Sequence, residues 1–421
     1  MTFSARLYAA LRSPLLPIWL VIFLLPFGRS SELGTLLCLI GTILLFVRSP
    51  HALADHPGAR LLLWLWAAYI GAAVISTPDA IDMGRSWLSV AGYLRYVPLG
   101  LYVCFAVRRH ARLRALIDAV AVVVALWTLD AWVQMLTGWS LGGHAQAVRI
   151  TGIFGADNMK LGPVLAALAP FVLWTAQVRW RRRGLIAAFA FMLGPILLAG
   201  ERSAWIVYGL VGLAFAWRES RTPARFAAWC AAACVVAVIG CGLAWQFSSR
   251  FHDRAERTLQ VFNGSEAGVN TAMSGRLDIW HTAWKMYLAH PINGVGVRDF
   301  RYAYPHYASK HDHFVTAESC GTDEGACHPH QLLLEIVTDT GTLGLVLWIV
   351  AAVLAWRHWR EVGDVAREMA FPVSVALAVA VFPVNTHLAF YSAWWGLMFW
   401  WLLALWCAAL YVLPDETEQP A

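Results

Sequence analysis

Apolar segments of roughly 20 residues dominate the sequence, and short polar stretches separate them. A helix of that length crosses the hydrocarbon core of a bilayer. We therefore expect twelve transmembrane helices, at residues 14–30, 33–48, 60–76, 86–107, 114–136, 161–178, 184–199, 203–217, 226–247, 331–356, 367–386 and 389–412. One long polar insertion, residues 248–330, separates the ninth helix from the tenth. The pattern predicts an all-α polytopic membrane protein, with a single membrane domain over residues 1–421 and one large loop.

The insertion has a helical pattern of its own. From Arg276 to Leu288 the apolar residues recur at helical spacing, with Ser274 as the expected N-cap and an end before His290-Pro291. Gly294 and Gly296 then predict a tight turn. The apolar face of this helix should consist of Leu277, Trp280, Ala283, Trp284, Tyr287 and Leu288. Because the loop is rich in Trp and Tyr, we expect it to lie against the membrane surface.

Composition and charge support a membrane protein and give it an orientation. Hydrophobic residues make up 59% of the chain and charged residues only 14%, with a net charge of +6. If the N-terminus is cytoplasmic, eighteen arginines fall in cytoplasmic segments, and only Arg29, Arg85, Arg149, Lys160 and Arg202 fall in the short external loops. This asymmetry predicts cytoplasmic termini and an external insertion. The basic residues cluster beside helices and form no soluble basic domain, so we expect no nucleic-acid partner.

His330 is the strongest candidate for chemistry. It stands where the long loop re-enters a hydrophobic helix, within the run His330-Gln331, nine residues, Gly341, two residues, Gly344. An imidazole titrates near neutral pH and can accept a proton from a hydroxyl group. A capping histidine at a helix start is the structural alternative.

Several basic residues could bind an anionic group near this histidine. Arg202 begins a helix on the external side, where free backbone amides also favour an anion, and Arg276 begins the predicted loop helix. Arg149 and Lys160 flank an external loop and could add positive charge. Arg95 lies in the middle of the fourth helix, where it either serves function or pairs with a carboxylate such as Asp130.

The loop also contains two cysteines and a group of histidines. Cys320 and Cys327 should form a disulfide on the oxidising side of the membrane, with two free thiols as the alternative. His306, His311 and His313, with Asp312, could ligate a metal. The sequence contains no HExxH and no paired CxxC, so we expect neither a metal nor a cofactor.

Three motifs in order resemble the O-antigen ligase and polymerase superfamily of bacterial envelope glycosyltransferases. His330-Gln331-x9-Gly341-x2-Gly344 is similar to the ligase pattern of His followed by Asn, Ser or Gln. The segment from Arg276-Leu-Asp-Ile-Trp280 to Pro291-x2-Gly294-x-Gly296-x3-Phe300 resembles the region before that histidine. Glu201-Arg202-Ser-Ala-Trp205 resembles the family's Ser-Arg-Gly-Ala-Trp element, with Glu for Ser and Ser for Gly.

The resemblance implies a GT-C-type glycosyltransferase of the bacterial inner membrane, an O-antigen ligase whose active site faces the periplasm. Its donor would be O-antigen linked to undecaprenyl pyrophosphate, and its acceptor a sugar hydroxyl of lipid A–core. Arg202 and Arg276, with Arg149 and Lys160, would bind the pyrophosphate. His330 would act as the base, and the transfer would be metal-independent and inverting.

Other functions fit parts of the pattern. An O-antigen polymerase or a protein O-oligosaccharyltransferase belongs to the same superfamily. One large external loop and a short C-terminal segment favour the ligase over both. A transporter or flippase of lipid-linked sugars would need polar residues along a path through the membrane, whereas the polar candidates here gather at one face.

Overall fold

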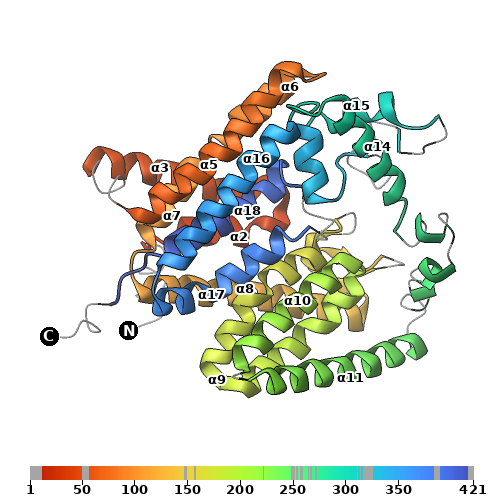
Figure 1. The fold of residues 1–421 in the computed structure, drawn as a ribbon. Coiled ribbons are helices and arrows are strands. Elements are labelled where there is room, and N and C mark those ends of the chain that lie inside the picture. The colour runs from red at the N-terminus through yellow and green to blue at the C-terminus, as the bar shows by residue number, and fades with distance from the viewer. Residues whose placement is uncertain are drawn as a thin grey trace.

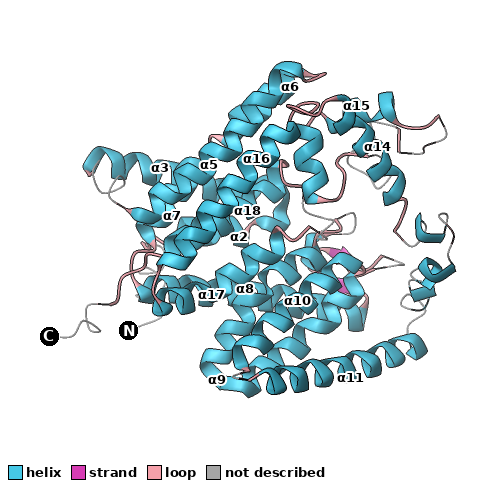
Figure 2. Ribbon diagram, viewed as in Figure 1, coloured by secondary structure: helices cyan, strands magenta, loops and turns pink. Residues whose placement is uncertain are grey.

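In the computed structural model about 79% of the described residues are helical (Figures 1 and 2). The structure describes residues 12–49, 56–146, 149–155, 158–220, 222–247, 252, 255–256, 259–263, 265, 268–270, 273–310, 312, 314–315, 326–383 and 389–415. Its α-helices are α2 (Leu16–Phe23), α3 (Glu32–Arg48), α5 (Pro57–Ser76), α6 (Met83–Tyr93), α7 (Tyr96–Ala106), α8 (His110–Thr137), α9 (Leu161–Ala199), α10 (Arg202–Glu219), α11 (Pro223–Phe247), α14 (Arg276–Ala289), α15 (Phe300–Tyr307), α16 (Leu332–Glu361), α17 (Asp364–Ala380) and α18 (Ala393–Ala409). Short 3-10 helices occur at η1 (Leu25–Ser31), η2 (Thr77–Asp79), η3 (Gly152–Phe154) and η4 (Gln260–Asn263). Strands β1 (Trp139–Ser140) and β2 (Gly143–His144) pair antiparallel.

Each of the twelve predicted membrane segments contains helix. Seven stretches of the described chain are long and apolar enough to cross a membrane, namely Leu25–Arg48, Pro57–Asp79, Met83–Ala106, His110–Thr137, Leu161–Ala199, Pro223–Gly240 and Leu332–Glu361. The fold is therefore all-α with several potential membrane spans, as predicted. The count of twelve stays a prediction, because α2, α10, α17 and α18 are not among these seven stretches.

Helix α9 is a helical hairpin, which explains its length of 39 residues. The helical geometry breaks at Trp180 and Arg181, where Arg181 has a φ of 53°. A methyl group added to Gly184 would lie 2.3 Å from the carbonyl oxygen of Ala176, so the two halves meet closely at the turn. The sequence correctly placed two segments here, at 161–178 and 184–199.

Helix α18 lies at the centre of the bundle and is buried on all sides. It packs against α5, α7 and α17, while α8, α9 and α10 form a neighbouring group (Figure 1). The indole of Trp401 donates to the carbonyl of Ile18 at 2.9 Å, and Trp400 and Trp401 are almost fully buried. A helix that is hydrophobic all round belongs in such a position.

The insertion folds against the beginning of α16. Helices α14 and α15 lie beside its first turns (Figure 1), over a small apolar core that includes Ile279, Met286 and Phe300. The predicted helix from Arg276 is confirmed and ends at Ala289, before the predicted stop.

Two details of the loop-helix prediction are wrong. The buried positions of α14 are Ile279, Thr282, Ala283 and Met286, whereas Trp284 and Leu288 of the predicted apolar face are exposed. Packing within the loop therefore buries a face of α14 that differs from the predicted one. Ser274 is not the N-cap either, because Gly275 occupies that position with a φ of 75°.

Candidate active site

The site lies at the end of the bundle where α9, α10 and α16 begin, at Leu161, Arg202 and Leu332. We call this end of the bundle the site end. A methyl group added to Gly162 would lie 2.7 Å from the Glu201 carboxylate, so α9 and α10 meet there. The opposite end holds the Arg218–Glu368 ion pair. The predicted site residues before α9, before α10 and before α16 therefore share one end of the bundle.

A buried glutamine organises the loop that carries Arg149. The carbonyl of the Gln134 side chain accepts hydrogen bonds from the backbone amides of Thr151 and Gly152, both at 2.8 Å. Its amide group donates to the Ser140 hydroxyl at 3.0 Å. With both ends of its side chain bonded, Gln134 holds the backbone just after Arg149 against α8.

Arg149 pairs with Glu201, the residue before α10. The guanidinium lies 3.7 Å from the Glu201 carboxylate, which is 5% exposed. The backbone amide of Ile150 also donates to the carbonyl of Leu198 at 3.3 Å. Arg149 is thereby placed next to Arg202, with a carboxylate that offsets part of its charge.

Lys160 takes a different position. Its ammonium group lies 4.3 Å from the ring centre of Trp394, at the start of α18, a cation–π contact. Burial lowers the pKa of Lys160. Lys160 is thus at the site end, but the contact that fixes it is aromatic.

Arg202 and Arg276 are brought together by Ser274. The Arg202 guanidinium donates to the Ser274 hydroxyl at 2.8 Å, and Arg276 begins α14 two residues later. Burial and the positive charge of Arg202 lower the pKa of Arg276 to about 10. Two guanidinium groups that weaken each other's charged form favour an anionic partner between them.

The same helix α14 contacts the residue before His330. Trp280, one turn after Arg276, donates from its indole nitrogen to the carbonyl of Pro329 at 2.9 Å. His330 itself has a φ of 54°, a conformation that side-chain-bearing residues seldom adopt, and its ring centre lies 4.0 Å from that of His328. Such strain persists only where surrounding contacts impose it, and it is concentrated at functional sites.

Gln331 explains the polar position that follows the histidine. It is the N-cap of α16, and its side-chain oxygen accepts from the backbone amide of Leu334. An Asn or Ser can make the same kind of bond. The motif therefore fixes the helix start that presents His330.

The two glycine motifs are halves of one structure. Gly341 breaks α16 with a φ of 66°. The freed carbonyls of Thr338 and Asp339 accept from the amides of Val295 and Gly296 at 2.8 and 3.1 Å.

On the other side of the break, the amides of Thr342 and Leu343 donate to the carbonyls of Pro291 and Ile292 at 2.9 and 3.0 Å. The Pro291–Gly296 segment therefore completes the hydrogen bonding of the broken helix. Gly294 and Gly341 are required because the two backbones touch.

Sequence reasoning missed three charged residues beside this break. Glu335 is 1% exposed, and its carboxylate accepts from the amides of Phe390 and Tyr391. The Asp339 carboxylate accepts from the amide of Arg298 at 3.0 Å. Acidic residues in the apolar run that begins α16 were the available signal. Arg298 gave no such signal in the sequence, because only the fold brings it next to α16.

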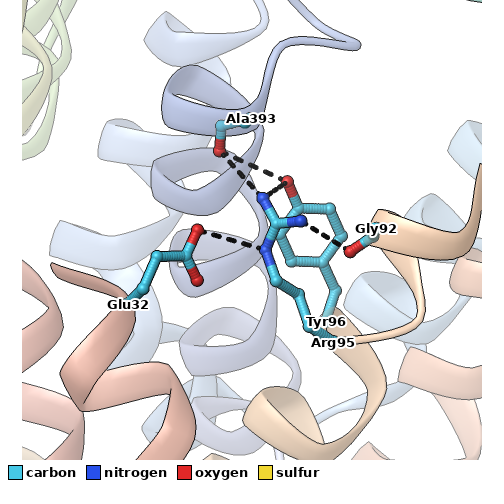
Figure 3. A network of polar contacts seen from close by, with 5 residues as sticks. All are labelled: Glu32, Gly92, Arg95, Tyr96 and Ala393. Carbon is cyan, nitrogen blue, oxygen red and sulfur yellow. Dashed lines mark hydrogen bonds and ion pairs between the residues drawn. The ribbon is translucent and has the colours of Figure 1, made fainter. Parts of the chain in front are cut away.

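The Arg95 network links four elements at the α6–α7 junction (Figure 3). Its guanidinium lies 3.3 Å from the carboxylate of Glu32 and donates to the carbonyls of Gly92 at 2.6 Å and Ala393 at 3.4 Å. It also covers the ring of Tyr96. The arginine thereby satisfies backbone groups at the ends of α6 and at the start of α18.

The predicted partner of Arg95 is wrong. Asp130 instead accepts a hydrogen bond from the backbone amide of Leu141 at 2.8 Å. Its carboxylate helps to fix the loop after α8, and Glu32, from a distant part of the sequence, pairs with Arg95.

The metal and disulfide predictions are only partly covered by the described residues. No cluster of three or more metal-ligating side chains occurs in the described part of the chain. His306 is exposed on α15, and His311 and His313 lie outside the described residues. Cys327 is disulfide-bonded. Because Cys320 also lies outside the described residues, its pairing with Cys327 stays a prediction.

An apolar cavity of about 380 Å³ extends from the neighbourhood of the break in α16. It lies between α5, α16, α17 and α18. Its lining includes Tyr69, Gly344, Trp348, Phe390, Tyr391 and Trp400. Such a cavity can hold a hydrocarbon chain but no charged group.

Comparison with known proteins identifies the region that contains this site. Residues 187–349 match the profile of a family described as O-antigen ligase, whereas no curated protein matches the sequence. The matched residues include Arg202, Arg276 and His330, together with the glycines at the break in α16. Over this region, which is less than half of the chain, the sequence is similar to the O-antigen ligase family.

Proposed function

We propose that this protein is a glycosyltransferase that moves O-antigen polysaccharide from undecaprenyl pyrophosphate to a sugar hydroxyl of lipid A–core. The observation that carries the proposal is the series of contacts from Arg202 through Ser274 and α14 to the residue before His330. This series connects the residues before and at the start of α14 with the residue before His330, which supports a shared site for two guanidinium groups and one imidazole. The similarity of residues 187–349 to the O-antigen ligase family supports lipid-linked glycans as the substrate class.

The chemistry follows from the charges of donor and acceptor. The acceptor hydroxyl attacks the anomeric carbon, the bond from that carbon to the pyrophosphate oxygen breaks, and its electron pair leaves with the pyrophosphate. Arg202 and Arg276 stabilise the negative charge on this leaving group, because guanidinium forms forked hydrogen bonds with phosphate oxygens. Neutral His330 takes the hydroxyl proton. A single displacement inverts the anomeric configuration.

Arg149 and Lys160 have supporting roles in this proposal. Arg149 holds Glu201 beside Arg202 and so positions the start of α10. Lys160 adds a positive charge near the start of α18. Periplasmic placement of the site end, cytoplasmic termini and a GT-C-type fold complete the proposal.

The decisive experiment is reconstitution of the purified full chain with a defined undecaprenyl-pyrophosphate glycan and lipid A–core. Wild type should form the glycolipid, and His330→Ala should abolish transfer while it still binds the donor. Arg202→Ala and Arg276→Ala should weaken donor use, with poor rescue by Lys because ammonium cannot fork. Transfer should persist in a chelator. Near-normal transfer by His330→Ala would refute the base assignment.

The same assay separates the alternatives. Extension of one lipid-linked glycan by another would identify a polymerase, and modification of a protein acceptor would identify an oligosaccharyltransferase. Movement of the lipid-linked sugar across vesicles without transfer would identify a transporter.

A further inference from the structure

A second group of arginines lies away from Arg202 and Arg276, at the break in α16. Arg298 lies two residues after the Pro291–Gly296 segment, Arg301 lies in α15, and Arg85 lies in α6. The Ser86 hydroxyl donates to the carbonyl of Val297 at 2.8 Å, so α6 is joined to the backbone just before Arg298. The guanidinium carbon of Arg85 lies 5.5 Å from the ring centre of Tyr302, a cation–π contact. We call Arg85, Arg298 and Arg301 the α15 arginine cluster.

These arginines carry charge that the described protein leaves without an ion-pair partner. Arg301 is only 9% exposed, and its Nε has no hydrogen-bond partner. Burial, followed by the charges of Arg298 and Arg85, lowers the pKa of Arg301 to about 10. Among the described residues, no carboxylate lies within ion-pair distance of any of the three guanidinium groups. Buried charges normally have such a partner.

The neighbouring carboxylates serve the backbone and leave acceptors open. One oxygen of Asp339 accepts from the amide of Arg298, and one oxygen of Asp299 accepts from the amide of Asp82 at 2.7 Å. The second oxygen of each is buried without a hydrogen-bond partner. Open donors and open acceptors side by side match a phosphorylated sugar, whose phosphate accepts hydrogen bonds and whose hydroxyl groups donate them.

Arg298 has a strained backbone conformation that places it next to Asp339 of α16. Its φ is 65°, and the bond from its amide to Asp339 fixes it there. Its charge acts on Glu335 and Asp339 of α16 and on the aromatic residues Tyr93 and Tyr96. A strained residue fixed by several contacts points to function.

The apolar cavity begins close to these arginines. Gly344 lines the cavity and lies three residues after Gly341, the break that Asp339 and the Val295–Gly296 amides adjoin. The cavity then follows α16 as far as Trp359. Charged groups at one end and an apolar cavity beyond match an amphipathic lipid.

We propose that the α15 arginine cluster binds a phosphate of the acceptor glycolipid and that an acyl chain of the same lipid enters the cavity. This inference rests on the proposed function, since it assigns the second lipid of that reaction. His330 then lies between two lipid sites. Arg202 and Arg276 hold the donor, and the α15 arginine cluster holds the acceptor about two helical turns along α16 from Gln331.

The test is lipid binding by the full chain in nanodiscs, with phosphorylated lipid A, phosphatase-treated lipid A and undecaprenyl pyrophosphate as probes. Wild type should bind phosphorylated lipid A about 10- to 100-fold more tightly than the phosphatase-treated lipid. Arg298→Gln and Arg301→Gln should abolish that difference and leave undecaprenyl pyrophosphate binding within about 2-fold. Glutamine keeps the Cβ of Arg298 and therefore the same backbone strain.

Controls separate binding from folding. Lys285→Gln changes an exposed basic residue of α14 and should bind all three lipids like wild type. Arg85→Gln, at an exposed position, should reduce the phosphate preference without loss of fold even if the buried variants unfold.

Two results would overturn the inference. One is equal affinity of wild type for both forms of lipid A, and the other is selective loss of undecaprenyl pyrophosphate binding in Arg298→Gln, which would assign the cluster to the donor. These measurements need no transfer, so a protein that binds phosphorylated lipid A through Arg298 but transfers no glycan would refute the proposed reaction alone.

Discussion

Arg202 donates a hydrogen bond to the hydroxyl of Ser274 at 2.8 Å, although 72 residues separate them in the sequence. This bond joins the start of α10 to the segment that begins α14. It fixes the distance between the two guanidinium groups that are proposed to bind the donor.

Ser274→Ala should therefore impair use of the donor. A hydrogen bond to a charged group contributes about 1.5–3 kcal/mol, so the KM for the donor should rise about 10-fold or more while His330 remains in place. Steady-state kinetics with varied donor would measure this. Ser220→Ala removes a hydroxyl at the other end of α10 and should leave the KM unchanged. Equal effects of the two variants would argue against the positioning role.

Gly341→Ala and Gly294→Ala should destabilise the protein severely. A methyl group at Gly341 would lie 2.3 Å from the carbonyl oxygen of Ile292, and one at Gly294 would lie 2.5 Å from the backbone of Asp339. Both glycines also have positive φ. A loss of about 3 kcal/mol or more is expected, visible as a large fall in Tm in detergent. Gly209→Ala in α10 has open space and should keep or raise the Tm.

Gln331 should tolerate only residues that can cap α16. Gln331→Asn and Gln331→Ser should keep activity, whereas Gln331→Ala should cost about 0.5–2 kcal/mol of stability and reduce turnover, because the start of α16 frays beside His330. Turnover and Tm measured together would test this. If the alanine variant matched the serine variant in both, capping would not be the role of this position.

Arg276→Gln should separate stability from activity. Burial, followed by the charge of Arg202, lowers the pKa of Arg276 to about 10 in the folded protein, so its charged form is disfavoured there. This cost is present at neutral pH and is relieved as the pH rises through about 10. Removal of the charge should stabilise the protein by on the order of 1 kcal/mol and weaken its use of the donor, as expected for Arg276→Ala.

The same pKa predicts how donor binding depends on pH. Undecaprenyl pyrophosphate binding to wild type should be constant between neutral pH and about pH 9, and should weaken as Arg276 loses its proton near pH 10. The Gln variant should lack that weakening. An Arg276→Gln protein with lower Tm and unchanged turnover would contradict the assignment.

The hydrophobic pattern indicated where helices occur, because a membrane segment is defined by local composition. It joined α6 and α7 into one predicted helix, 86–107, and its count of twelve spans stays a prediction. It placed the two halves of α9 and the helix from Arg276 correctly. It could not choose the buried face of α14, since the core beneath the loop depends on residues as distant as Phe314 and Ala326. For the same reason it missed Glu32 as the partner of Arg95.

Candidate site residues were identified from the sequence where a motif carried them, and their roles stay predictions. Arg202, Arg276 and His330 lie in recognisable patterns, and the structure links them through Ser274 and Trp280. Ser274 looked like a helix cap because its type and position suited one, but Gly275 took that place. Arg298 was missed because a single arginine in a loop has no distinguishing spacing, and its importance arises from the break at Gly341.

The break in α16 separates the part of the helix that contacts the loop from the part that lies among the membrane helices. The first turns of α16, with Gln331 and the proposed base, are tied by hydrogen bonds to the Pro291–Gly296 segment across the interruption at Gly341. The reactive end can therefore keep its shape while the lipid-facing helices change in evolution. Homologues should diverge freely in their hydrocarbon-facing residues and still retain the same chemistry.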